Sequence, residues 1–100
     1  MNVGAVVVNY NSWDCLRQCL ECMFLQSTKF CRVVVVDNNS HEKDQSLLNQ
    51  YQDKVEFIHL SENVGFAAAN NLAINMLDDC EFVALVNPDA FLDRCWLANM

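Results

Sequence analysis

Runs of apolar residues alternate with amphipathic segments along the whole chain. Four runs predict strands, and the most continuous are typical of strands covered on both faces of a sheet: Val3–Val8, Val33–Val36, Val55–Leu60 and Phe82–Val86. The intervening segments have apolar residues at helical spacing and predict helices: Trp13–Phe24, His41–Gln52, Phe66–Leu77 and Phe91–Met100. Strands that alternate with helices pair in parallel through right-handed crossovers. The pattern therefore predicts an α/β fold, a three-layer Rossmann-like sandwich with a mostly parallel sheet.

Two serines precede predicted helices at positions that suit an N-cap. Ser12 is followed by Asp14 in a first turn, and Ser40 by Glu42 and Asp44. A serine side chain at this position can accept a hydrogen bond from a free backbone N–H, and acids in the first turn complement the helix dipole. We therefore expect the first two helices to begin directly after Ser12 and Ser40.

Polar clusters follow three of the predicted strands. They are Asn9-Tyr10-Asn11, Asp37-Asn38-Asn39-Ser40 and Asn87-Pro88-Asp89. Because open α/β sheets bind ligands at the carboxyl ends of their strands, the clusters are expected to converge on one binding edge. Turn chemistry alone is the competing interpretation of each cluster. An apolar strand needs no carboxylate for its own stability, so Asp89 indicates a metal and phosphate site.

Composition limits the classes of function. With 100 residues, 53% of them hydrophobic, and only two glycines and one proline, the chain is expected to form one domain with a real core. The net charge is −7 and the six Lys and Arg residues are scattered, which argues against a nucleic-acid partner. The apolar runs are too short to cross a bilayer. We expect a cytoplasmic location, or membrane association through regions outside this segment.

The six cysteines allow three interpretations. Three disulfides would suit a small secreted scaffold, but the strong strand and helix periodicity of this chain, whose amino terminus has no basic segment before an apolar one, is a poor match to such a scaffold. The spacing Cys15-x3-Cys19-x2-Cys22 resembles the iron–sulfur signature of radical S-adenosylmethionine enzymes, yet Glu21 stands where that family usually has an aromatic residue. A helix would also spread the three thiolates along its length. Structural thiols on an amphipathic helix are the preferred interpretation.

Four motifs occur in an order that resembles a known family. They are Val7-Val8-Asn9-Tyr10-Asn11, Val35-Val36-Asp37-Asn38-Asn39-Ser40, Asn63-Val64-Gly65-Phe66-Ala67-Ala68-Ala69-Asn70-Asn71 and Leu85-Val86-Asn87-Pro88-Asp89-Ala90. Together they resemble family 2 glycosyltransferases with the GT-A fold, most of all the rhamnosyltransferase-like branch. The resemblance spans nearly the whole chain but covers only the amino-terminal, nucleotide-binding half of that family's catalytic domain. We expect residues 1–100 to be this half, truncated and inactive alone.

The resemblance implies a metal-dependent, inverting transfer of a sugar from a nucleotide-diphosphate donor to a hydroxyl of a glycan or lipid-linked glycan acceptor. Asp89 is then the ligand of a divalent metal, Mg²⁺ or Mn²⁺. The general base is expected beyond residue 100, and neither His41 nor His59 is assigned to it. The residues implied to bind the nucleotide sugar are Val8, Asn9, Tyr10, Asp37, Asn38, Asn63, Gly65, Asn70, Asn71 and Asn87.

Two other classes of function stay open from the residues themselves. A non-catalytic nucleotide- or ligand-binding α/β module would carry the same polar clusters. A phosphoacceptor receiver domain also uses acids at strand ends, but it needs an acidic cluster where this chain has Asn9-Tyr10-Asn11. The apolar ending around Phe91, Trp96 and Leu97 further predicts that the 100-residue chain self-associates through its fourth strand or last helix.

Overall fold

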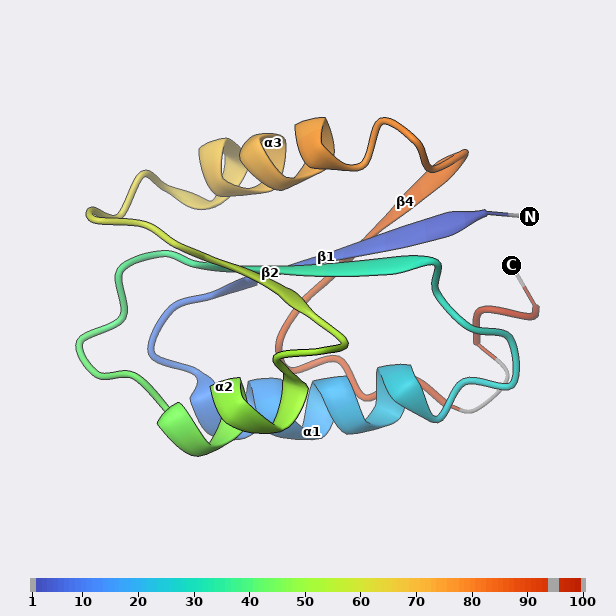
Figure 1. Cartoon of the computed structure of the whole chain (residues 1–100), viewed down its shortest axis with the longest axis horizontal. Helices are drawn as coiled ribbons and strands as arrows, with labels where there is room; N and C mark the ends of the chain where they lie inside the picture. The colour runs from blue at the N-terminus through green and yellow to red at the C-terminus, as the bar shows by residue number, and fades with distance from the viewer. Residues whose placement is uncertain (1, 94–95, 100) are drawn as a thin grey trace.

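The computed structural model describes residues 2–93 and 96–99. Within them, four strands form one parallel sheet in the order β3-β2-β1-β4. The strands are β1 (Val3–Asn9), β2 (Arg32–Asp37), β3 (Glu56–His59) and β4 (Phe82–Val86). The helices are α1 (Trp13–Phe24), α2 (Gln45–Tyr51) and α3 (Phe66–Met76). Helix α3 covers one face of the sheet while α1 and α2 cover the other, so the predicted three-layer α/β sandwich is confirmed (Figure 1).

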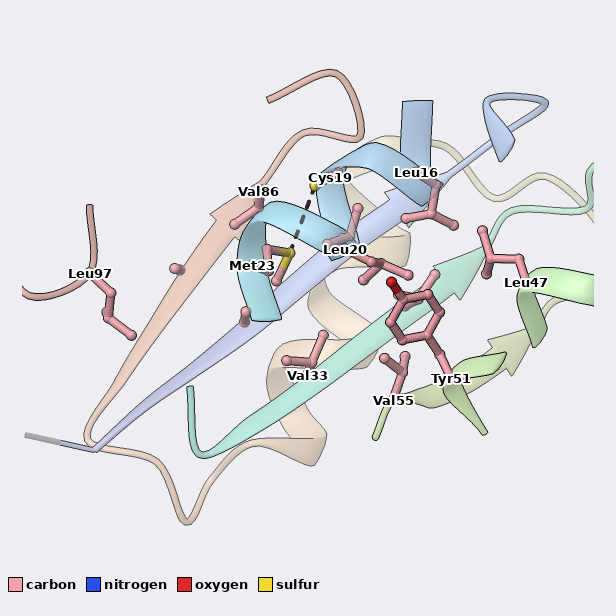
Figure 2. Packing of buried hydrophobic residues seen from close by; sticks show 14 of the residues in the cluster. Leu16, Cys19, Leu20, Met23, Val33, Leu47, Tyr51, Val55, Val86 and Leu97 are labelled. Atoms are coloured by element: carbon pink, nitrogen blue, oxygen red, sulfur yellow. Dashed lines mark hydrogen bonds between the residues drawn. The ribbon is translucent and has the colours of Figure 1, made fainter. Parts of the chain in front are cut away.

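The two faces of the sheet build two separate hydrophobic cores. Alternate residues of β1 point to opposite faces, so Val7 packs toward α1 and α2 whereas Val6 packs toward α3. Figure 2 shows Leu16 and Leu20 of α1 and Tyr51 of α2 meeting over the sheet in the first core. Every residue of β1 is buried, which explains the unbroken run without polar side chains from Val3 to Val8.

Helix α2 begins later than its sequence pattern predicted. The expected start after Ser40 is wrong, because α2 begins at Gln45 and Asp44 occupies its N-cap. The Asp44 carboxylate accepts the Leu47 N–H at 3.0 Å, and it also pairs with Arg17 at 3.1 Å. The Ser40 hydroxyl instead accepts the Asn11 N–H and donates to Asp37, so it bonds within the rim loops and does not cap a helix.

The prediction of a helix over Phe91–Met100 is also wrong for residues 91–93 and 96–99, which the structure describes. Residues 91–93 have no regular structure and residues 96–99 form a turn, whereas 94, 95 and 100 lie outside the described residues. The buried side-chain amide of Gln26 donates to the Asp93 carbonyl and accepts the Leu97 N–H at 2.9 Å. Those two backbone groups would bond to each other in an α-helix. The glutamine therefore takes the place of a helical hydrogen bond.

Strand β4 is at an edge of the described sheet and pairs there only with β1. Its Phe82 and Leu85 side chains are each 54% exposed. None of the helices in the described part of the chain is long and apolar enough to cross a membrane.

Candidate functional site

The loops that follow the strands meet at one edge of the sheet, which we call the carboxyl rim: residues 9–12, 37–41, 60–65 and 87–89. Asn9 lies in register with Asp37, and Asp37 with His59. The amino ends of α1, α2 and α3 lie along the same edge (Figure 1). The predicted convergence of the polar clusters after β1 and β2 is directly visible, because Asn9 Nδ2 donates to Asp37 Oδ1 at 3.1 Å.

Ser40 connects the loops after β1 and β2. Its hydroxyl donates to Asp37 Oδ1 and accepts the Asn11 N–H at 2.9 Å. Asn11 in turn accepts the His41 N–H at 2.9 Å through its side-chain oxygen. Asn11 and Asn39 have φ values of 52° and 65°, a left-handed conformation that asparagine tolerates better than most residues. The asparagines therefore shape the two loops as well as lining the rim.

Asp37 is the most heavily bonded residue of the rim. Its side chain is 1% exposed, and it accepts hydrogen bonds from Asn9, from the Ser40 hydroxyl and N–H, and from Lys43 Nζ at 3.0 Å. Burial by itself would raise the pKa of Asp37, but the hydrogen bonds from Ser40 and Lys43 outweigh it and hold the pKa below its usual value. The residue is a buried carboxylate that braces the loops.

Lys43 also contacts the end of β3. Its Nζ lies 2.9 Å from His59 Nδ1. Burial and the nearby ammonium lower the pKa of His59, so the ring is neutral at neutral pH and its Nδ1 can accept from Lys43. Lys43 was not among the predicted site residues, and only the folded chain brings it to Asp37 and His59.

The segment before α3 is held in place by Asn38. The buried Asn38 side chain accepts the Val64 N–H at 2.9 Å and donates to the Gly65 carbonyl at 3.3 Å. Asn63 Oδ1 accepts the Gly65 N–H at 2.9 Å. Gly65 has φ 87° and ψ 163°, a conformation that is essentially restricted to glycine. No side chain caps α3, so the amino end of this helix offers free N–H groups at the rim.

The two asparagines of α3 differ in their surroundings. Asn70 is 6% exposed and donates to the Phe66 carbonyl at 3.1 Å within the helix. Asn71 is exposed.

Near the end of β1, Val8 and Asn9 are buried whereas the Tyr10 ring is 43% exposed. Asn9 Oδ1 is buried without a hydrogen-bond partner among the described residues, whereas buried polar groups in folded proteins are nearly always hydrogen-bonded.

The loop after β4 forms a hollow with the start of α1. Asn87, Pro88 and Asp89 line it together with Ser12 and Cys15, and its volume is about 420 Å³. The Asn87 and Asp89 side chains are exposed. Sequence reasoning identified Asn87 and Asp89 as site residues, whereas it considered Ser12 as a helix N-cap and Cys15 as a structural thiol.

Cys19 lies behind this hollow. Its Sγ is 3.6 Å from the Asn87 carbonyl. Burial, with the charges of Cys22 and Asp89 as smaller causes, raises the pKa of the Cys19 thiol to about 12. It is therefore a neutral structural group, which agrees with the interpretation of the α1 cysteines as structural thiols.

The donor set for a metal in this hollow is small. Asp89 is its one carboxylate and Asn87 its one side-chain amide. In residues 2–93 and 96–99 there is no group of three or more His, Cys, Asp or Glu side chains that could hold a metal ion. The residues fit a hard cation that takes one carboxylate from the protein and its other oxygen ligands from a diphosphate and water.

A parallel α/β sheet with helices on both faces and polar loops at its carboxyl rim is typical of the doubly wound class, whose members bind ligands at that edge. Residues 5–100 match the family model of "Glycosyl transferase family 2". The chain therefore belongs to glycosyl transferase family 2.

Two curated relatives have similar sequences. The teichoic acid poly(glycerol phosphate) polymerase of Staphylococcus epidermidis is 29% identical over 84 residues, which is 80% of this chain and 12% of the relative. The glycosyltransferase GlyA of Streptococcus pneumoniae is 24% identical over 101 residues, or 98% of this chain and 14% of the relative. The chain thus spans only a small part of the length of these proteins.

Solved structures of GT-A glycosyltransferases have the same fold. TarS 1-349 from S. aureus superposes with a TM-score of 0.86 and 26% identity over 99% of this chain and 31% of that one. A further TarS structure contains UDP-GlcNAc, with 25% identity and a TM-score of 0.86. A third structure is the mannosyltransferase PcManGT from Pyrobaculum calidifontis in complex with GDP-Man and Mn²⁺. It is 24% identical, with a TM-score of 0.79 over 90% of this chain, and this similarity shows the shared fold alone.

Proposed function

We propose that this chain supplies the donor-binding and metal-binding half of a metal-dependent, inverting glycosyltransferase. The observation that carries the proposal is the Asn87–Asp89 hollow, which opens beside the braced loops of the carboxyl rim. The ordered motifs favour the rhamnosyltransferase-like branch, and we place the reaction in the cytoplasm, with any membrane association through regions outside this segment. A glycan or a lipid-linked glycan would be the acceptor.

The charges at the rim support the need for a cation. The chain has a net charge of −7, and a nucleotide diphosphate would add further negative charge. Among the residues that the structure describes, Lys43 and Arg17 lie beside the rim loops and α2, and they are already paired with Asp37 and Asp44. A bound Mg²⁺ or Mn²⁺ would stabilise the charge on the leaving diphosphate as a Lewis acid.

Different residues of the rim would then contact different parts of the nucleotide-sugar donor. The nucleobase would lie against exposed Tyr10, beside a polar hollow of about 640 Å³ that Asn11 and Lys43 help to line. Val8, Asn9, Asp37 and Asn38 would act mainly by holding these loops, since their side chains are buried. We assign contact with the donor to the exposed side chains and support of the loops to the buried ones.

The diphosphate would lie between α3 and the loop after β4. The free N–H groups after Gly65 favour an anion, with Asn63 and Asn71 exposed beside them. Asn87 would contact ribose or metal, and Asp89 would bind the metal. Direct displacement at the anomeric carbon also needs a base that takes the acceptor proton, and no residue of this chain is assigned to it.

The relatives support the class of donor. TarS, at 25% identity, has been solved with UDP and with UDP-GlcNAc. A nucleotide-diphosphate sugar is therefore the donor class to test first, beginning with UDP and comparing it with GDP.

Calorimetry of this chain with UDP or GDP, with and without Mn²⁺, tests the proposal. We expect metal-dependent binding that Asp89→Ala abolishes while the circular dichroism spectrum is unchanged. Asp53→Ala is the matched control, because it removes one exposed acid from the turn before β3 and should leave binding intact. Binding of equal strength in EDTA would contradict the metal assignment, and no binding of either nucleotide would contradict the donor site.

A further inference from the structure

Two cysteines far apart in the sequence meet at the end of the sheet opposite the carboxyl rim. Cys31 directly precedes β2, and Cys80 lies two residues before β4. Their Sγ atoms are 3.0 Å apart although 49 positions separate them in the chain. Figure 1 shows the starts of β2 and β4 on either side of the start of β1.

The backbone around both thiols is anchored. The Cys31 N–H donates to the Val3 carbonyl at 2.9 Å, and the Cys80 N–H donates to the Leu77 carbonyl at 3.0 Å. The Cys80 sulfur lies directly over Gly4, where an added Cβ would be only 2.9 Å from it. The glycine thus leaves the space that lets Cys80 approach Cys31 across β1.

The two thiols differ in their exposure. Cys31 is exposed and Cys80 is half-buried. Burial, followed by the hydrogen bond with Cys31, raises the pKa of Cys80 to about 12, so Cys80 is a neutral thiol at neutral pH. Cys31 is therefore the group that a dissolved oxidant meets first, and Cys80 is the neighbour positioned to react second.

We propose that Cys31 and Cys80 form an oxidation site whose oxidant is a peroxide and whose product is an intrachain disulfide. The Cys31 thiolate attacks one peroxide oxygen, the O–O bond breaks, and Cys31 becomes a sulfenic acid as one water is released. The Cys80 sulfur then attacks the Cys31 sulfur, the S–S bond forms, and the S–O bond breaks with loss of a second water. In total two thiols and one hydrogen peroxide give one disulfide and two waters, with two electrons passing to the peroxide.

The disulfide would join segments that the reduced fold already holds together. It would close a loop that contains β2, α2, β3 and α3, and such a closure stabilises a fold mainly by restricting its unfolded chain. The site is separated from the carboxyl rim by the length of β1, about 20 Å at the usual rise per residue. Oxidation should therefore stiffen the scaffold without occupying the donor site, and the proposal does not depend on the function proposed above.

Tryptic mapping can identify this bond without ambiguity. Cleavage at Lys and Arg releases Cys31 in the peptide Phe30–Arg32 and Cys80 as the one cysteine of Val55–Arg94. After the reduced chain is treated with one equivalent of hydrogen peroxide, we expect a loss of about 2 Da and a cross-link between these two peptides. The melting temperature should rise by about 10 °C and return to its starting value with dithiothreitol.

Variants distinguish this site from general thiol oxidation. Cys31→Ser and Cys80→Ser should each abolish the cross-link and the rise in melting temperature, while Cys15→Ser, on α1, should retain both. A sulfinic acid on Cys31 without a cross-link, a disulfide between two chains, or a bond from Cys31 to an α1 cysteine would overturn the proposal. The protein is denatured in urea and alkylated before digestion, so the mapping detects the disulfide even in a variant that folds poorly.

Discussion

Replacing Asp37 with asparagine should remove the bracing of the carboxyl rim while changing the volume of the side chain little. The buried carboxylate accepts four hydrogen bonds in this structure. An asparagine has one oxygen in place of two and presents N–H groups in place of the other. The Ser40 N–H and Lys43 Nζ share Asp37 Oδ2 and would lose their acceptor.

The size of the effect follows from the burial of the lost partners. A buried N–H left without a partner costs about 1–3 kcal/mol. The Lys43 pair contributes less, about 0.5–1 kcal/mol, because its Lys43 side chain is 43% exposed. Asp37→Asn should therefore lower the free energy of unfolding by about 1.5–4 kcal/mol, or the melting temperature by about 6–30 °C for a domain of this size.

Urea unfolding followed by circular dichroism measures this change. Lys43→Met is the matched control, since it removes the ammonium and leaves both Ser40 bonds to Asp37, so it should cost under about 1 kcal/mol. If Asp37→Asn cost no more than Lys43→Met, the reasoning that the buried carboxylate braces the rim would be refuted.

The pH dependence gives an independent test of the same residue. Because the pKa of Asp37 is lower in the folded than in the unfolded chain, the unfolded chain binds more protons near pH 4. The stabilisation by Asp37 is complete above its unfolded pKa, about 4, and is lost as the pH falls through its lower folded value. Asp37→Asn should therefore flatten the acid limb of stability against pH, while a slope unchanged from the original chain would contradict the assignment.

Three further expectations concern other parts of the fold. Gly65→Ala should cost about 1–3 kcal/mol in urea unfolding from backbone strain alone, since nothing lies within 4 Å of the added Cβ; no loss would mean that the loop relaxes. Gln26→Ala should cost about 1–3 kcal/mol, because it leaves the buried Leu97 N–H without its acceptor, and a loss as small as that of Gln50→Ala, an exposed control, would contradict this role. The chain should self-associate through the β4 edge, so light scattering should show a mass that rises with concentration and falls in a Leu85→Lys variant; a monomer at all concentrations would refute it.

The alternation of apolar and polar residues was sufficient to predict the class of the fold. Val3–Val8 and Val33–Val36 could be recognised as buried strands because a strand covered on both faces must be apolar at every position. The polar residues after β1, β2 and β4 could be identified as candidates because strand ends are where such sheets bind ligands. These features depend on neighbours in the sequence or on general rules of topology.

The tertiary structure decided which partner each polar group takes. Ser40 had the local signature of a helix cap, but its hydroxyl donates to Asp37 and accepts the Asn11 N–H. Helix α2 is capped by Asp44 instead. The apolar spacing near the carboxyl end favoured a helix, but Gln26, which follows α1, bonds to two of the backbone groups that such a helix would use.

Contacts between residues distant in sequence have no periodic signal. Cys31 and Cys80 meet only because β2 and β4 flank β1 in the sheet. Lys43 reaches both Asp37 and His59 for the same reason, since β3 pairs with β2 at the rim. A hydrogen bond or thiol contact of this kind depends on three-dimensional proximity. Spacing along the chain therefore predicts the helices and strands, whereas tertiary packing determines which side chains meet.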